Sequence, residues 1–137
     1  MAPDRGDGQH HRVRTMTTTK ARKQRKAQFN APWHKRHRLM SAHLSEEYLE
    51  DKKRKLPRAV PVRKGDVVKI MRGDDAGKEG KVASADYRSL RITIEGITHA
   101  KSDGTQIAKT IHPSNVLIVK LDETDPLRLK KFEGARE

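Results

Sequence analysis

Apolar and polar residues alternate in short runs along the second half of the chain, and glycine-rich turns separate the runs. The clearest run is residues 90–96, where leucine or isoleucine at every second position alternates with arginine, threonine and glutamate. A period of two is typical of a strand with one buried face. We therefore predict strands over this run, over residues 66–71 and over residues 79–87.

Two more strands are predicted around a hairpin turn. Residues 98–102 and 106–111 flank Asp103-Gly104-Thr105, and Asp-Gly is a common two-residue hairpin turn. The run VLIVKL at 116–121 is almost continuously apolar, which indicates a strand buried on both faces. Several short antiparallel strands predict a mainly β fold, a small closed barrel, because closure removes the exposed edges of a sheet.

The first half of the chain favours short helices instead. We predict helices over residues 20–28, with Thr19 as the N-cap, and over residues 32–40, with Pro32 at the first helical position. A third helix is predicted after Ser45, because SEEYLEDKKRK has acids at its start and bases at its end, which complement the helix dipole.

Prolines and a short amphipathic run complete the expected elements. Pro57 and Pro61 bound an extended connector, since the residue before a proline avoids the helical region. The sequence DPLRLKKFEGARE at 125–137 predicts a short helix and a frayed end.

Charge divides the chain more sharply than hydropathy does. The 137 residues carry a formal net charge of +13. Residues 1–63 hold 17 Lys and Arg against 6 Asp and Glu, whereas residues 64–137 hold 14 against 12. The excess favours a polyanionic partner, namely nucleic acid, an anionic membrane surface or an acidic protein.

The remaining composition narrows the class of protein. Hydrophobic residues make up 33% of the chain, so the core must be small. Cysteine is absent, which excludes a disulfide framework and cysteine-based zinc sites. Apolar runs reach only about four residues, against the roughly 20 that span a bilayer, and no secretory signal is recognisable. We expect a soluble intracellular protein.

Residues 20–38 form the most basic segment, with eight Lys and Arg and no acid. Such a run can be a solvated, disordered tail, because like charges repel. Phe29, Trp33, Leu39 and Met40 lie among the charges, however, and a purely electrostatic tail would not need them. We favour an arm that orders on a polyanion, where arginines bind phosphates and aromatic rings stack on bases.

The stretch RGDDAGKEGKV at 72–82 admits three interpretations. A phosphate-binding loop would need four residues between its glycines, a Ser or Thr after the lysine and a following helix, and all three are missing. An adhesion tripeptide is not supported without a secretory signal. A turn between strands remains, in which Gly73, Gly77 and Gly80 allow unusual backbone angles or close approach of another backbone, even RNA.

A metal site and a catalytic site find little support in the sequence. His34 and His37 lie three residues apart, but further zinc ligands are lacking and neighbouring cations would repel a metal ion. Asp74 and Asp75 are adjacent in a turn, and no nucleophile motif is present. We expect no catalytic residues, no metal and no cofactor.

The sequence VRKGDVVKIMRGDDAGKEGKVASADYR at 62–88 resembles a KOW motif, which forms half of an SH3-like barrel. KOW motifs occur in ribosomal proteins and in transcription elongation factors. The arm sequence RKQRKAQFNAPWHKRHRLMSAHLSEE at 22–47 and the later SDGTQIAKTIHPSNVLIVKL at 102–121 resemble the archaeal and eukaryotic branch of the large-subunit ribosomal protein twenty-four family.

This resemblance implies a structural, non-enzymatic constituent of the large subunit of the cytoplasmic ribosome. It implies binding to the 5′ region of large-subunit rRNA, an early role in assembly and a place near the peptide exit tunnel. Expected partners are rRNA and neighbouring ribosomal proteins, with no membrane, small-molecule substrate or homo-oligomer. The implied RNA-binding residues are Lys20, Arg22, Lys23, Arg25, Lys26, Trp33, His34, Lys35, Arg36, His37, Arg38, Lys64, Arg72, Gly73, Lys78 and Lys81.

The expected organisation has four parts. These are a disordered tail (1–18), a basic arm with short helices (19–60), a KOW-type SH3-like barrel (61–121) and a C-terminal extension (122–137). The residues before Met16 lie outside the resemblance, so translation from Met16 is an alternative. Two other functions stay open at this point: a KOW-domain transcription or translation factor acting off the ribosome, and an NTP-using enzyme.

Overall fold

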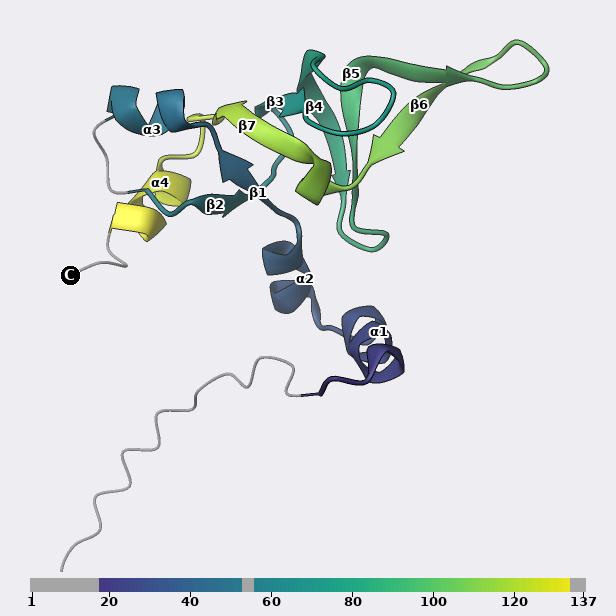
Figure 1. Cartoon of the computed structure of the whole chain (residues 1–137). Helices are drawn as coiled ribbons and strands as arrows, with labels where there is room; N and C mark the ends of the chain where they lie inside the picture. Colours follow the sequence, from purple (N-terminus) through teal and green to yellow (C-terminus); the bar gives the residue numbers. More distant parts are fainter. Residues whose placement is uncertain (1–17, 53–55, 134–137) are drawn as a thin grey trace, which may run out of the picture. The chain divides into compact units, whose positions relative to one another are not determined.

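The structure is a computed structural model that describes residues 18–52 and 56–133 (Figure 1). Apart from Thr18, the tail expected over residues 1–18 lies outside the described residues. Contacts divide the chain into two compact units, Met1–Ala31 and Pro32–Glu137, which we describe separately as the first and second unit.

Helix α1 (Ala21–Phe29) is the one regular element described in the first unit, and every one of its residues is exposed. The N-cap is Lys20, without a side-chain cap, so the expected capping by Thr19 was wrong. Thr18 supports the start of the helix instead: its hydroxyl accepts from Lys20 N at 3.3 Å and its carbonyl from Gln24 Nε2 at 2.9 Å. The helix therefore has local hydrogen bonds but no buried face.

The second unit is built on seven strands: β1 (Ser41–Leu44), β2 (Ala59–Pro61), β3 (Val67–Ile70), β4 (Glu79–Asp86), β5 (Arg91–Ala100), β6 (Gln106–Ile111) and β7 (Val116–Lys120). Their order is β2-β1-β7-β3-β4-β5-β6, and only β1 and β7 pair in parallel (Figure 1). The mainly β, SH3-like fold is as predicted. The prediction of a closed barrel was wrong. Strands β1 and β2 lie at the edge beside β7, and among the described strands β2 and β6, at the two ends of the sheet, do not pair with each other.

Three α-helices and a 3-10 turn accompany these strands: α2 (Trp33–Leu39), α3 (Glu46–Lys52), η1 (Pro113–Asn115) and α4 (Pro126–Glu133). The cap predicted for α3 is confirmed, since Ser45 Oγ accepts from Tyr48 N at 3.3 Å. In α2 the predicted Pro32 takes the N-cap position rather than the first helical one. The short C-terminal helix is present as α4.

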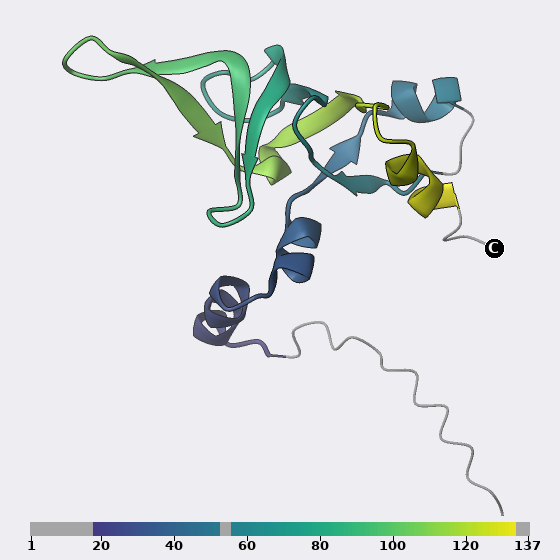
Figure 2. The ribbon, with the colours of Figure 1, turned by 180° about the vertical axis from the view of Figure 1, so that it is seen from behind.

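Two predicted strands merge into one. The strands predicted over residues 90–96 and 98–102 are parts of the single strand β5, which begins at Arg91 and ends at Ala100, and its pairing with β6 shifts register between Thr93 and Thr98. Gly96, with φ of +79°, lies within this irregularity. The hairpin turn at Asp103-Gly104 is confirmed, with Thr105 N donating to Asp103 Oδ1 at 3.1 Å, but it is longer than two residues because β5 ends at Ala100 and β6 begins at Gln106. Figures 1 and 2 show this long β5–β6 hairpin extending beyond the other strands of the unit.

Strand β7 differs from its prediction on one face. Val116 and Ile118 are buried, but Leu117 and Val119 on the other face are only half-buried. The run therefore carries more apolar surface than the fold itself covers.

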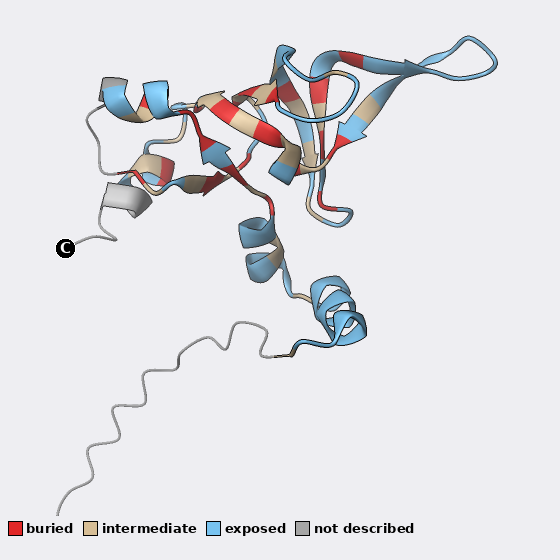
Figure 3. Cartoon of the chain, viewed as in Figure 1, coloured by how far each residue is buried: buried red, intermediate tan, exposed pale blue. Residues whose placement is uncertain are grey.

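The core draws on both halves of the sequence (Figure 3). Met40, Leu44 and Val60, which the charge pattern assigned to an arm, are buried together with Val68, Ile92 and Ile118 of the predicted barrel. Strands β1 and β2, which were not predicted, bring them there, because β1 pairs with β7 through His43 and Leu44. Residues 41–44 and 59–61 are thus part of the folded sheet and not of a separate arm.

A buried ion pair ties α4 to the start of β3. Arg128 donates to Asp66 Oδ1 and Oδ2 at 2.6 and 2.8 Å, and to the carbonyl of Pro61 at 2.9 Å. The carboxylate of Asp66 also accepts from the backbone amides of Arg63 and Asp122, each at 2.9 Å. The aspartate of the KOW-like Gly65-Asp66 pair is therefore a structural hub.

Candidate nucleic-acid interface

Helix α1 presents cations without neutralising acids. The side chains of Lys20, Arg22, Lys23, Arg25 and Lys26 are exposed, and none of them bonds to another side chain among the described residues. Phe29, at the end of the helix, is 72% exposed. A helix of nine residues without a buried face is too short to be stable alone, since isolated helices become marginal at about 12–15 residues.

Helix α2 is fixed to the turn between β4 and β5 by one of its faces. The Arg36 guanidinium donates to the carbonyls of Arg88 and Tyr87, at 2.7 and 3.5 Å. The ring of His37 lies 4.1 Å from the ring of Tyr87, tilted by 44°. Two of the residues implied as RNA contacts thus have contacts within the protein, and these contacts orient the helix.

The other residues of α2 are open to a ligand. His34, Lys35 and Arg38 are exposed and have no side-chain partner among the described residues. Trp33 is 61% exposed, and Arg36 Cζ lies 5.8 Å from the centre of its ring. Since residues three and four apart share a helix face, contacts of Arg36 and His37 with the sheet leave a cationic face outward.

The loop between β3 and β4 contains the RGDDAGKEGKV stretch, and ion pairs fix its conformation. Asp75 Oδ1 pairs with Lys78 Nζ, and Asp75 Oδ2 with Lys109 Nζ from β6, each at 2.7 Å. These hydrogen bonds, from Lys109 first and Lys78 second, lower the pKa of Asp75 to about 2, and the contact with Asp75 raises the pKa of Lys109. Lys78 therefore has a structural partner only three residues away.

Arg72 and Gly73 lie at the outer part of this loop. Arg72 is exposed and has no side-chain partner among the described residues, while Asp74 beside it is 98% exposed. Gly73 has φ of +99°, a region that side chains with a Cβ rarely adopt. The loop tip thus offers a single arginine next to a solvent-facing carboxylate.

Gly80 serves the sheet rather than an RNA backbone. A Cβ at this position would lie 2.5 Å from Ile94 Cγ2 and 2.9 Å from the carbonyl of Glu95. The close neighbour is therefore strand β5 of the same sheet. Another backbone does come close to Gly80, as predicted, but it is that of strand β5 of the same protein and not RNA.

Lys64 and Lys81 are exposed near the start of β3 and on β4. The pKa of Asp122 is lowered chiefly by the hydrogen bond from the Thr124 hydroxyl, and the charge of Lys81 contributes. Both lysines are accessible to phosphate, although Lys81 has a carboxylate in its electrostatic neighbourhood.

Lys109 is the residue that sequence reasoning missed at this surface. It reaches the β3–β4 loop from β6, 34 positions along the chain, so no local spacing could indicate the contact. A cavity of about 220 Å³ lies beside it, with Arg72, Arg91 and His112 among its lining residues. Burial, and then the charge of Arg91, lower the pKa of His112.

Residues 18–52 and 56–133 contain no arrangement of side chains that could form a metal site. No three His, Asp or Glu side chains converge there as metal ligands. His37, one of the pair weighed in the sequence, contacts Tyr87 instead. The helices within the same residues are all too short or too polar to cross a membrane.

Comparison with known proteins covers both the basic arm and the sheet. Residues 18–134 match the model of a family described as the eukaryotic ribosomal proteins L26 and their archaeal L24-type counterparts. The chain is also 50% identical over 117 residues to the large ribosomal subunit protein uL24 of Methanothrix thermoacetophila. This alignment covers 85% of the chain and 98% of the relative.

Proposed function

The chain belongs to this family of eukaryotic L26 and archaeal L24-type ribosomal proteins, and on this premise we propose that it binds the 5′ region of large-subunit rRNA through its exposed cations. The protein is a structural constituent of the large ribosomal subunit, located in the cytoplasmic ribosome, and not an enzyme. The match extends over the arm as well as the KOW-like motif, which favours this function over a transcription factor acting off the ribosome.

One observation carries the RNA-binding proposal. Residues 20–38 hold eight Lys and Arg and no acid, and seven of the eight have no side-chain partner among the described residues. The exception is Arg36, which the β4–β5 turn holds. Cations without a partner in the protein can bind phosphate oxygens. Binding then releases the counterions of the RNA, so its affinity depends on the salt concentration.

The proposed division of roles follows from these contacts. The exposed cations of α1 and α2, with Lys64, Arg72 and Lys81, contact phosphates. Arg36, His37 and Lys78 act chiefly by holding α2 and the β3–β4 loop in position. Trp33, which is exposed beside the cations, stacks on a base.

Binding of the 5′ region also implies early entry into subunit assembly, since that region is transcribed first. We propose, in addition, a final place near the peptide exit tunnel, which the family resemblance suggests.

Substitution of Arg22, Arg25 and Lys26 by glutamine tests the role of the arm. Binding to a transcript of the rRNA 5′ region is measured over a range of salt concentrations. The slope of log K against log salt is negative, and each lost phosphate contact lowers its magnitude by about 0.7–0.9, so the magnitude falls by roughly 2–3 in the variant. Glutamine at Lys101 and Lys130, which are exposed and lie outside the proposed RNA contacts, is the control.

An unchanged slope in the arm variant would contradict phosphate contacts by α1. Equal affinity for transcripts of the 5′ and 3′ regions would contradict the choice of RNA region, even if the slope fell.

A further inference from the structure

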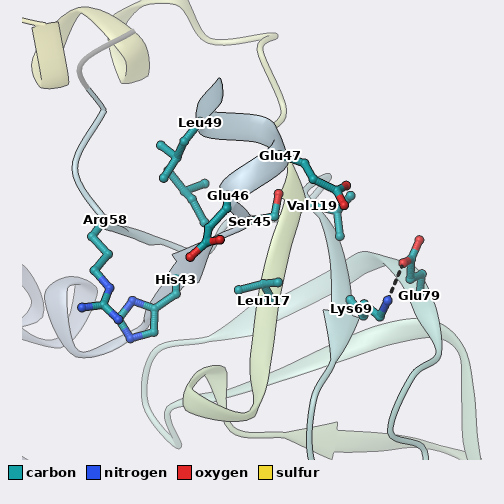
Figure 4. Close-up of a pocket in the computed structure, with 11 residues that line it drawn as sticks. His43, Ser45, Glu46, Glu47, Leu49, Arg58, Lys69, Glu79, Leu117 and Val119 are labelled. Carbon is teal, nitrogen blue, oxygen red and sulfur yellow. Dashed lines mark ion pairs between the residues drawn. The ribbon is translucent and has the colours of Figure 1, made fainter. Parts of the chain in front are cut away.

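An open groove of about 620 Å³ lies between the start of α3 and the outer face of the sheet (Figure 4). Its apolar lining includes Leu117 and Val119 of β7 and Leu49 of α3, which are all half-buried. Leu117 and Val119 lie on the face of β7 opposite to the core residues Val116 and Ile118. The groove thus retains apolar surface that the fold leaves in contact with water.

Acidic side chains outnumber basic ones around this surface. Glu46 and Glu47 from α3 and Glu79 from β4 line the groove, against Arg58 and Lys69. Lys69 pairs with Glu79 at 3.6 Å, as Figure 4 shows. Glu46 and Glu47 make no ion pair within the described residues. In a chain of net charge +13, this lining is locally acidic.

The charge around the groove argues against RNA as its occupant. A phosphate backbone would meet the carboxylates of Glu46 and Glu47. Lys69 is paired with Glu79, so Arg58 and His43 are the basic side chains of the lining that remain to compensate. Proteins that assemble on the same RNA neutralise its phosphates with Lys and Arg, so basic segments are common among them. Such a segment would find opposite charge at Glu46 and Glu47 and apolar surface at Leu117.

We propose that this groove binds a basic segment of a neighbouring large-subunit protein, with an apolar side chain over Leu117 and Val119 and a Lys or Arg beside Glu46 and Glu47. The proposal goes beyond RNA binding and rests on the chain's place in the large subunit. Strand β7 is already paired on both sides, with β1 and β3. The segment therefore binds through side chains and does not add a strand to the sheet.

Photo-crosslinking in assembled large subunits tests the proposal. The probe p-benzoylphenylalanine replaces Glu47 in the groove and, as a matched control, the exposed Glu95 of β5. We expect position 47 to crosslink to a peptide of another ribosomal protein. Adding Glu46→Lys to the Glu47 probe should lower the crosslink yield roughly threefold or more, because it places a cation against a basic segment. Glu50→Lys, outside the groove lining, should lower the crosslink yield less than Glu46→Lys does.

Three results would overturn the proposal: crosslinks from position 47 to rRNA, crosslinks only to other residues of this chain, or no crosslinks although the subunits contain the protein. Affinity of the same variants for the 5′ transcript is measured in parallel. That readout depends on the basic surfaces, so failure of the groove and failure of the RNA-binding proposal give different results.

Discussion

At the scale of single residues, Asp66 and Arg128 show how a charged pair can hold a small core together. Both side chains are almost fully buried, and the oxygens of Asp66 accept from Arg128 and from the amides of Arg63 and Asp122. A buried carboxylate in these surroundings is satisfied only while its guanidinium partner is present. The pair thus joins the KOW-like motif to the C-terminal helix.

Removing one partner of this pair should therefore be costly. Arg128→Met is expected to lower the free energy of unfolding by about 3–5 kcal/mol, because it leaves a buried charge without its partner. Urea denaturation measures the change. Arg63→Met is the control, since its pair with Asp125 is about half exposed and contributes only about 0–1 kcal/mol. Equal effects of the two substitutions would contradict the structural role of Arg128.

Asp75 gives a second expectation at this scale, concerning pH. Its pKa in the folded protein is about 2, below the ordinary value of 3.8, because Lys109 and Lys78 donate to it. A depressed carboxyl pKa stabilises the fold above the unfolded pKa, and this stabilisation is lost as pH falls toward about 2.

The difference in unfolding free energy between the wild type and Asp75→Asn should accordingly be constant above pH about 5 and shrink between pH about 4 and 2. Denaturation at a series of pH values measures it. Asp74→Asn should change stability less at neutral pH, because the Asp74 carboxylate is 98% exposed and lies 3.6 Å from Lys109 Nζ, farther than that of Asp75. A difference that stayed constant down to pH about 2 would show that the Asp75 ion pairs do not form.

At the scale of elements, α2 illustrates a short helix that depends on one contact surface. It has seven residues, too few for stability alone, and its contacts with the β4–β5 turn come from Arg36 and His37. The docked face fixes the direction in which Lys35 and Arg38 point. Part of the basic surface is therefore positioned by contacts within the protein.

Tyr87→Ala should separate positioning from phosphate contact. Loss of the His37 ring contact is expected to weaken binding to the 5′ transcript severalfold without changing its salt slope, because no phosphate contact is removed. Lys35→Gln, in contrast, should lower the magnitude of the slope by about 0.7–0.9. A smaller magnitude of the salt slope in Tyr87→Ala would mean that the substitution removes phosphate contacts. Both variants are measured by binding to the 5′ transcript over a range of salt concentrations.

At the scale of the whole molecule, the two units differ in what can stabilise them. The second unit has a continuous core, whereas α1 in the first unit buries no residue. Free energy for ordering α1 must then come from a partner, and the cations along it favour RNA.

Hydrogen exchange should show this difference directly. In the protein alone, amides of Ala21–Phe29 are expected to exchange almost unprotected, while those of β7 are strongly protected. On adding the rRNA 5′ transcript, α1 amides should become protected and β7 amides should change little. Strong protection of α1 without RNA would contradict an arm that orders on its partner.

Sequence by itself determined the local features of this protein. Alternation in residues 90–96, the Asp-Gly turn at 103–104 and the cap at Ser45 each depend on neighbouring residues, so each could be predicted. The basic run at 20–38 was equally visible, because charge is a property of composition. The family resemblance, carried by contiguous motifs, is confirmed by the match over residues 18–134.

Only the tertiary structure decided which of these residues are used within the fold. Strand β1 exists because β7 offers it an edge, and Asp66 meets Arg128 across 62 positions of the chain. Asp75 likewise captures Lys109 from β6, and Arg36 reaches the carbonyl of Arg88. Such contacts join residues that are distant in sequence, so no local period or spacing encodes them. For the same reason, the sequence alone could not separate the cations that hold the protein together from those that the fold leaves exposed.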